Sequence, residues 1–150
     1  MTNKIKQVKA VKGDVFKLAH HLRTDDINEI EAKGKTPLQA LEQAFVSSYE
    51  CMKLVKNNQI IGMYGISKHG IIWFLGTDEM ENNPFYFVRE GKKVINKWLK
   101  THKTLWNIVD SRNRTHIKWL EVIGAKFNKH RYLIINGVRF YPFSITRERE

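Results

Sequence analysis

Two aspartates stand where an open sheet with helical crossovers would place chemical groups. Asp78 follows the apolar run of residues 71–76, and Asp110 follows the apolar run of residues 105–109. Sites in such sheets form beyond the carboxyl ends of the strands, where a carboxylate can act as a general base or contact a substrate. The alternative, which we prefer for each residue alone, is that both cap turns. The sequence therefore nominates Asp78 and Asp110 as candidate catalytic bases that compete with a capping role.

The second aspartate belongs to a strand–turn–helix–strand unit, LWNIVDSRNRTHIKWLEVIGAKF, at residues 105–127. A polar turn at residues 110–112 precedes a helix that has Asn113 near its start and Gly124 just past its end. This order leaves strand and helix ends facing one cleft, as a ligand-binding crossover requires. Asn113 is either a helix cap or a ligand contact, and we prefer the cap.

Hydrophobic periodicity predicts the remaining elements. Residues 71–76 are apolar at nearly every position, which indicates a central strand buried on both faces. The other expected elements are a strand at 4–11, helices at 15–23 and 25–33, a helix from 37, strands on either side of a turn at 57–58, a helix at 85–100, and a hairpin that turns at 136–137. The prediction is one α+β domain covering residues 1–150, with a mixed, mostly antiparallel sheet and flanking helices.

Apolar spacing also predicts the buried faces of two helices. Thr36 should cap the helix that starts at Pro37. Its expected buried stripe consists of Leu38, Leu41, Phe45 and Val46. In the helix at 85–100, which Gly91 weakens, the expected inner face consists of Phe85, Val88, Val94, Ile95 and Trp98.

The net charge of +11 is concentrated in one part of the chain. Residues 1–88 hold 11 Lys and Arg against 10 Asp and Glu, whereas residues 89–150 hold 15 against 5. A one-sided basic surface attracts polyanions, which include nucleic acid, a nucleotide cofactor and an acidic partner protein. A surface that merely aids solubility is the alternative.

Several classes of protein are not expected. No apolar run approaches the roughly 20 residues of a membrane span, and the first residues lack an apolar signal core, which favours the cytoplasm. Cys51 is the single cysteine, so it forms no internal disulfide and is expected to be buried packing rather than a nucleophile. The histidines have no partners at metal-ligand spacing, so no metal is expected.

Two blocks carry a family resemblance: IIWFLGTD at residues 71–78 and the stretch at residues 105–127. Together they resemble a family of proteins with the general N-acetyltransferase (GNAT) fold that is encoded by tailed bacteriophages. That family includes the internal virion protein A of short-tailed phages. The resemblance implies a sheet that is splayed in the middle, where the strands ending at Gly76 and Val109 diverge to open a groove.

The resemblance also implies acetyl-CoA as the cofactor. In this fold, N–H groups of a loop at a helix N-terminus hold the pyrophosphate. A strand N–H polarises the thioester carbonyl. Carried over by position, the cofactor contacts would be Leu75, Gly76, Thr77, Arg89, Lys92 and Asn113.

The chain departs from the family pattern at two places. The loop at residues 77–83 reads TDEMENN, so three acids replace the usual glycines. Leu120 occupies the position of the tyrosine that usually serves as general acid. Tyr132 or Tyr141 could substitute from the hairpin, although core or rim packing is the commoner role for such tyrosines.

The sequence thus predicts a phage-encoded, GNAT-fold protein that is associated with the virion or acts in assembly or ejection. Its expected partners are other virion or host proteins, with DNA contact through the basic C-terminal half. It would act in the host cytoplasm or within the virion. The alternative is an active acetyl-CoA-dependent N-acetyltransferase that modifies a host or phage amine, with Asp78 or Asp110 as base. Nucleic-acid binding alone is a third hypothesis.

Overall fold

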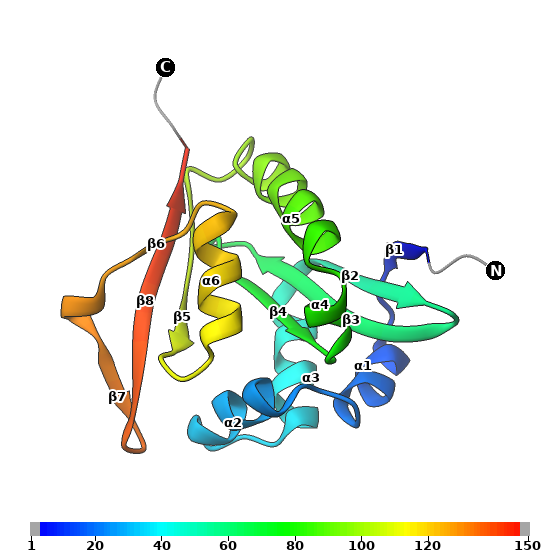
Figure 1. Cartoon of the computed structure of the whole chain (residues 1–150), viewed down its shortest axis with the longest axis horizontal. Coiled ribbons are helices and arrows are strands. Elements are labelled where there is room, and N and C mark those ends of the chain that lie inside the picture. Colours follow the sequence, from blue (N-terminus) through cyan, green and yellow to red (C-terminus); the bar gives the residue numbers. More distant parts are fainter. Residues whose placement is uncertain (1–3, 148–150) are drawn as a thin grey trace. The chain divides into compact units, whose positions relative to one another are not determined.

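The computed structural model describes residues 4–147. The chain divides into two compact units, Met1–Asn82 and Asn83–Glu150, each of which contains its own four-stranded sheet (Figure 1). All strand pairs within these sheets are antiparallel. The prediction of a single domain concerns how the two units combine, and it stays a prediction.

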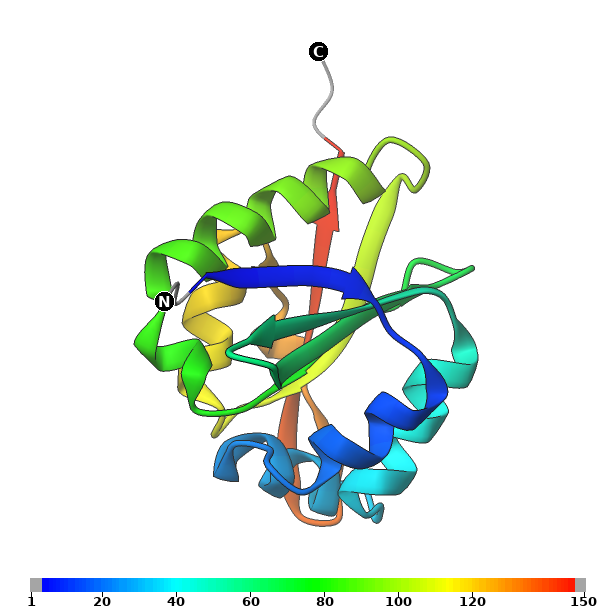
Figure 2. The same cartoon turned by 90° about the vertical axis from the view of Figure 1, so that its right-hand side faces the viewer.

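The first unit contains three helices beside a sheet of order β1-β2-β3-β4, followed by one short helix (Figure 2). Its elements are β1 Ile5–Lys9, α1 Lys12–Ala19, α2 Thr24–Ala32, α3 Pro37–Ser47, β2 Ser48–Lys56, β3 Gln59–Ser67, β4 Ile72–Gly76 and α4 Glu79–Asn82. The core of this unit centres on side chains from α1, α3 and β3, namely Leu18, Leu41 and Met63, each fully buried.

The start of α3 follows the capping chemistry that the sequence predicts. The Thr36 hydroxyl accepts a hydrogen bond from the Gln39 N–H at 3.2 Å, and the Gln39 side chain accepts one from the Thr36 N–H at 3.0 Å. Pro37 occupies the first helical turn. The prediction that Val46 lies in the buried stripe is wrong, because that side chain is 81% exposed. It comes one residue after Phe45, and one residue turns a helix by about 100°.

The sequence predicts that β4 is a central strand. In its own sheet, however, β4 is the last strand in the order. No residue of β4 is exposed, however, as the apolar run indicated. The ring of Phe74 lies against the two glycines Gly62 and Gly76, which pair across β3 and β4. A Cβ atom at Gly76 would come within 2.8 Å of this ring, so a larger residue would displace it.

The second unit contains two α-helices and a sheet of order β5-β8-β6, in which β8 also pairs with β7. Its elements are α5 Pro84–Trp98, β5 Thr104–Asp110, α6 Arg114–Val122, β6 Lys126–Phe127, the 3-10 helix η1 Lys129–Arg131, β7 Leu133–Ile135 and β8 Val138–Thr146. The predicted hairpin of β7 and β8 is confirmed. Asn136 and Gly137 have φ angles of 48° and 80°, the pair of positive values that a type I′ turn requires.

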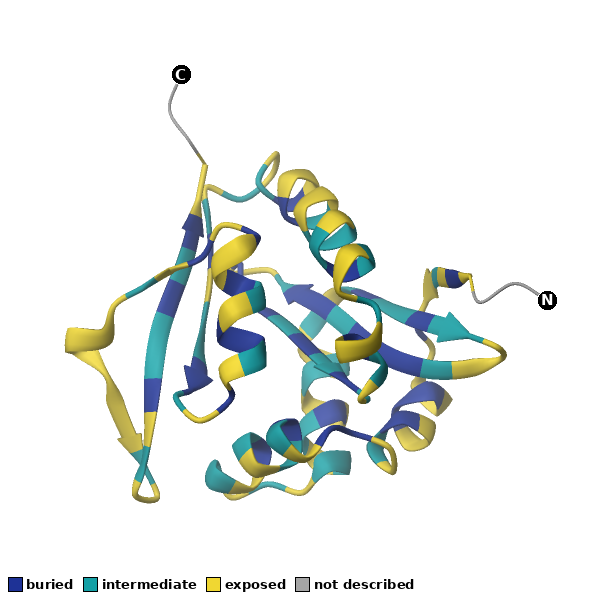
Figure 3. Ribbon diagram, in the orientation of Figure 1, coloured by how far each residue is buried: buried dark blue, intermediate teal, exposed yellow. Residues whose placement is uncertain are grey.

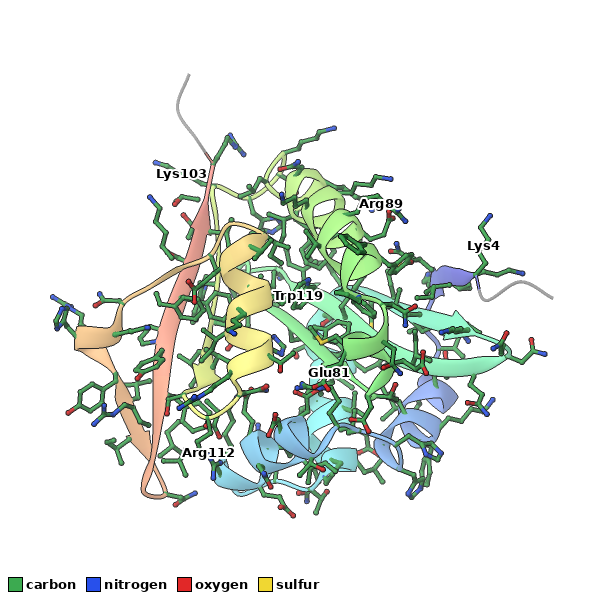
Figure 4. All side chains as sticks on the ribbon, in the orientation of Figure 1. Lys4, Glu81, Arg89, Lys103, Arg112 and Trp119 are labelled. Carbon is green, nitrogen blue, oxygen red and sulfur yellow. The ribbon has the colours of Figure 1, made fainter. Side chains whose placement is uncertain are left out.

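Helices α5 and α6 of this unit are joined by close contacts. The Trp119 indole Nε1–H donates a hydrogen bond to the Phe87 carbonyl oxygen at 2.9 Å (Figure 4). Gly91 permits the approach, because a Cβ atom there would lie 3.1 Å from Cγ2 of Ile123.

The prediction that Phe85 belongs to the inner face is wrong, since its side chain is 88% exposed. At about 100° per residue, Phe85 lies almost opposite the buried Phe87.

Burial follows the sheets and the inner faces of the helices, whereas β7 and η1 are mostly exposed (Figure 3). In residues 4–147, no helix combines the length and apolarity needed to cross a membrane.

Candidate functional site at the carboxyl end of strand β4

The backbone of Gly76 is bound on both sides by the segment that begins α2. Its N–H donates to Oδ2 of Asp26 at 3.1 Å. Its carbonyl oxygen accepts a hydrogen bond from the N–H of Arg23 at 2.8 Å. The N–H group of Gly76, one of the cofactor contacts that the GNAT resemblance implies, is therefore already hydrogen-bonded to a carboxylate of the chain itself.

The carboxylate of Asp26 is held by a buried ion pair. Nη1 of Arg23 lies 3.0 Å from Oδ1 of Asp26, and both side chains are only 2% exposed. Buried charges are stable only when they are paired and hydrogen-bonded, and Asp26 satisfies this with Arg23 on one oxygen and Gly76 on the other. These two residues thus fix α2 to the end of β4.

Arg23 also reaches the acidic loop that follows β4. Its Nη2 lies 3.2 Å from Oε1 of Glu81 and 3.5 Å from Oδ2 of Asp25. A second cation, Lys56 at the end of β2, places its Nζ 2.8 Å from Oε2 of Glu79. Cations near the loop are therefore paired with the loop's own carboxylates.

Several N–H groups of the loop donate hydrogen bonds to other groups of the first unit. Thr77 donates its N–H to the Ile61 carbonyl at 3.0 Å and accepts a hydrogen bond on Oγ1 from Glu79 N–H at 3.2 Å. The N–H groups of Met80 and Glu81 donate to the carbonyls of Thr77 and Asp78, forming the short helix α4. The N–H groups of Thr77, Glu79, Met80 and Glu81 are thus used within the first unit.

The candidate base Asp78 is exposed at the start of this loop, directly after Thr77. Leu75 is half-buried in β4, paired with Met63 of β3. Exposure leaves Asp78 in contact with water, and its backbone carbonyl supports α4. Its catalytic role stays a prediction, and so do the cofactor roles of Leu75, Gly76 and Thr77.

The second candidate base, Asp110, lies in the other unit and is 1% exposed. Its carboxylate accepts hydrogen bonds from the Arg112 N–H at 2.8 Å and from Arg112 Nη2 at 2.6 Å (Figure 4). This is an aspartate turn closed by a charge-assisted bond. The arrangement favours the capping alternative for Asp110, although no finding tests its catalytic role.

Asn113 is buried, at 1% exposed, and occupies the N-cap position of α6. Its side chain makes no capping hydrogen bond to that helix, while its N–H donates to the Asp110 carbonyl at 3.0 Å.

Leu120, at the position of the usual acid, is 3% exposed and packs in the core. A leucine cannot donate a proton, so the substitution removes acid chemistry from this position.

The remaining nominated residues lie on α5. Arg89 has a side chain that is 62% exposed, and its Nε lies 3.0 Å from Oε2 of Glu90. The pKa of the Glu90 carboxyl is lowered, first by the hydrogen bond from Arg89 and further by Lys93. Lys92 is exposed. Arg89 is therefore engaged with its own helix, and the cofactor roles of Arg89 and Lys92 stay predictions.

Cys51 is buried in β2, as expected for a packing residue. Burial raises the pKa of its thiol to about 11, and the charge of Asp14 contributes to the rise. Asp14 itself is 3% exposed, lies 3.0 Å from Lys53 Nζ, and accepts the Val11 N–H at 2.8 Å. A thiol with such a pKa is not a nucleophile near neutrality.

Sequence reasoning missed the residues that matter most at this site. Arg23 looked like the end of one helix, Asp26 like the first turn of the next, and Lys56 like a strand end. The three-residue spacing between Arg23 and Asp26 was the one local signal for this ion pair. Nothing local indicated that Asp26 reaches Gly76, which is 50 residues away.

Comparison with solved structures shows the fold that this geometry belongs to: the chain has the GNAT acetyltransferase fold. It superposes on a spermidine N-acetyltransferase of Vibrio cholerae in complex with CoA and spermine, with a TM-score of 0.66, 12% identity, and 97% and 96% of the two chains covered. An acetyltransferase of the GNAT family from Bacillus anthracis gives a TM-score of 0.65 at 12% identity, with the same coverage. An Elizabethkingia anophelis acetyltransferase with acetyl-CoA bound gives 0.62 at 13%, covering 97% and 100%.

The chain belongs to the family described as "Bacteriophage T7, probable scaffold protein Gp13", whose model matches residues 50–131. The relative from Escherichia phage T7, named "Probable scaffold protein gp13", is 31% identical over 147 residues. The alignment covers 95% of this chain and 96% of that protein. The expectation of a phage protein with a GNAT-like fold is therefore confirmed.

Several groups at β4 that an acetyl-CoA could use have partners within the chain. The N–H of Gly76 is bound to Asp26, and the N–H groups of Thr77, Glu79, Met80 and Glu81 are bound within the first unit. The loop also carries Glu79 and Glu81, whose charges oppose a phosphate. As for metals, residues 4–147 contain no group of three or more His, Cys, Asp or Glu placed to hold an ion.

Proposed function

We propose that this protein is a non-enzymatic assembly protein of a tailed phage, in which the GNAT fold serves as a scaffold for contacts with other phage proteins. It acts in the host cytoplasm during particle formation and is incorporated into the virion, as the resemblance to internal virion protein A suggests. The scaffold-protein family supports the assembly role. Acetyltransfer is not favoured.

The observation that carries this proposal is the hydrogen bond from Gly76 N–H to the buried Asp26 carboxylate. To receive a thioester, the site would have to release Asp26 from that N–H while Arg23 stayed buried. Leaving a buried polar group unsatisfied costs about 1–3 kcal/mol, and more for a charged one. A cofactor would have to supply this energy from its own binding.

The acidic loop opposes the cofactor further. Two unit charges 4 Å apart repel by about 1 kcal/mol in water and more in a partly buried site. Lys56 and Arg23 could neutralise a phosphate, but they already pair with Glu79 and Glu81. The tyrosine that usually serves as general acid is missing as well, since Leu120 takes its place.

Calorimetric titration with acetyl-CoA at millimolar concentration tests the non-enzymatic part. We expect no heat of binding, whereas the spermidine N-acetyltransferase of Vibrio cholerae, run in parallel, should bind. Saturable binding with a Kd well below 1 mM, or transfer of acetyl to any amine, would contradict the proposal and restore the enzyme hypothesis.

Deletion of the gene from the phage tests the assembly part. We expect particles that lack the protein to form or infect poorly, and mass spectrometry of wild-type particles to detect the protein. Normal yield and infectivity of the deletion phage would count against the assembly role. Absence from wild-type particles would remove the virion association alone.

DNA contact through the basic C-terminal half is a second part of the proposal, supported by the net charge of +10 in residues 89–150. Binding to phosphates releases counterions, so the affinity for DNA should fall steeply as salt is added. A mobility shift repeated at several salt concentrations measures this slope, and the lack of any shift at low salt would exclude the contact.

A further inference from the structure

The β7–β8 hairpin exposes apolar side chains that its own unit does not cover. Leu133 is 46% exposed and Ile134 is 58% exposed, although adjacent strand residues point to opposite faces. Tyr132, just before β7, is 44% exposed. A folded unit normally buries one face of a strand, so a strand that leaves both faces open has room for an additional partner. Figure 1 shows β7 at the outer side of β8.

The surroundings of these apolar residues are uniformly basic. Residues 122–147 contain no Asp or Glu. They contain five Lys and Arg, namely Lys126, Lys129, Arg131, Arg139 and Arg147. The ion pairs found within residues 4–147 involve other side chains. The positive charge of the hairpin is therefore available to attract an anion.

The edge of β7 is also open for hydrogen bonding. Within the described residues, β7 pairs with β8 alone. The Arg139 carbonyl accepts the Ser111 N–H at 2.9 Å, so it points away from β7. Ile134 is the partner of Arg139 across the hairpin, and two opposed residues of an antiparallel pair either exchange both hydrogen bonds or both turn their backbone groups away from each other. The N–H and carbonyl of Ile134 consequently face the open edge.

We propose that this hairpin docks an extended acidic segment of another phage protein, with apolar side chains that cover Leu133 and Ile134. The proposal rests on the assembly role proposed above and names the chemistry of the partner. Acidic groups would contact Lys129, Arg131 and Arg139, while the backbone of the segment would add to the edge at Ile134. Exposed strand edges are templates for such pairing.

Charge and packing favour a polypeptide over the other polyanions and over a second copy. Nucleic acid would gain little from aliphatic Leu133 and Ile134, and one face of the Tyr132 ring that could stack on a base is occupied by Arg139, whose Cζ lies 4.3 Å from its centroid. A second copy docked through the same hairpin would bring two basic surfaces together, which repel.

Binding measurements with each purified structural protein of the phage particle test the proposal. We expect one acidic protein to bind, and the double variant L133T/I134T to weaken this binding at least tenfold, because threonine keeps the strand preference and removes apolar contact. V8T is the matched control, since Val8 is a 44% exposed strand residue of β1. The charge variant R131E should also weaken binding at least tenfold. Circular dichroism and thermal melting establish that each variant is folded.

Amide hydrogen exchange gives a readout independent of the variants. In the complex, we expect slower exchange at Ile134, while Val8 exchanges as in the isolated protein. Equal affinity of wild type and L133T/I134T for the partner would overturn the proposal, as would the absence of binding to every particle protein. Binding of a single-stranded or duplex oligonucleotide that the same variants weaken would assign the surface to nucleic acid instead. None of these results depends on acetyl-CoA or on the deletion phage, so the proposed function can stand when the docking site fails.

Discussion

Gly76 and Asp26 are joined by a hydrogen bond from backbone N–H to carboxylate at 3.1 Å, across 50 residues of sequence. The bond places the Asp26 carboxylate at the strand end to which the GNAT resemblance assigns cofactor contacts. Because the same carboxylate pairs with buried Arg23, the charge cannot leave without unfolding part of the site.

Asp26→Asn should destabilise the protein strongly. The substitution leaves the guanidinium of Arg23, 2% exposed, without its buried counter-charge, and breaking such a pair costs roughly 3–5 kcal/mol. Urea denaturation followed by circular dichroism measures the free energy of unfolding. Asp25→Asn is the matched control, because Asp25 is 47% exposed and 3.5 Å from Arg23, so its loss should cost less than about 1 kcal/mol. Similar losses for the two variants would show that the buried pair does not hold α2 to β4.

Gly91→Ala and Gly13→Ala should change stability in opposite directions. Both glycines lie in helices, where alanine is favoured by about 1 kcal/mol. A Cβ atom at Gly13 meets nothing within 4 Å, so Gly13→Ala should stabilise. At Gly91 the new atom would lie 3.1 Å from Ile123 Cγ2, and overpacking costs about 1–3 kcal/mol. Thermal melting compares the two, and a rise in Tm for Gly91→Ala would mean that α5 and α6 can separate slightly without loss.

Trp119→Phe should lower the free energy of unfolding by about 1–2 kcal/mol, because it removes the 2.9 Å hydrogen bond to the Phe87 carbonyl and some of the ring contact. The edge-to-face contact between Trp119 and Phe87, with centroids 6.4 Å apart, would be reduced as well. Trp106→Phe is the control, since that side chain is 43% exposed. Chemical denaturation followed by far-ultraviolet circular dichroism avoids the change in fluorescence, and equal effects of the two variants would argue against the α5–α6 hydrogen bond.

Cys51 should resist alkylation in the folded protein. Its pKa is raised to about 11, so the thiol stays protonated as pH rises through 8, where only about 0.1% would be thiolate. An unfolded chain, with an ordinary thiol pKa near 8.5, would be about a quarter ionised at that pH. We therefore expect iodoacetamide to react at least a hundredfold more slowly without urea than in urea at pH 8. The native rate should still climb tenfold per pH unit between pH 8 and 10, and a plateau near pH 8.5 would contradict the raised pKa.

Local signals in the sequence were sufficient for most elements. Thr36-Pro37 predicts the start of α3, and Asn136-Gly137 predicts the β7–β8 turn, because capping and positive φ depend on a few adjacent residues. Helix faces were less certain at the ends: Phe85 stands in the first turn of α5 and faces water. The apolar side chain of Phe85 suggested burial, but its position around the helix axis turns it toward solvent.

The candidate site was predicted only in part, for a physical reason. The absence of glycine and the acids of the loop were visible in the sequence and indicated poor cofactor chemistry. The partners of those acids were not visible, because Arg23 lies 58 residues before Glu81 and Lys56 lies 23 before Glu79. Ion pairs between distant segments depend on how the strands and helices pack, which residue type and spacing do not determine.

The pairing of Lys56 with Glu79, and of Arg23 with Glu81, has a consequence for the protein inside an infected cell. A fold that is completed by a metabolite gains stability with the logarithm of the concentration of that metabolite once it exceeds the Kd. Here the chain provides both the cations and the anions, so its melting temperature should not depend on the concentration of anionic metabolites in its surroundings.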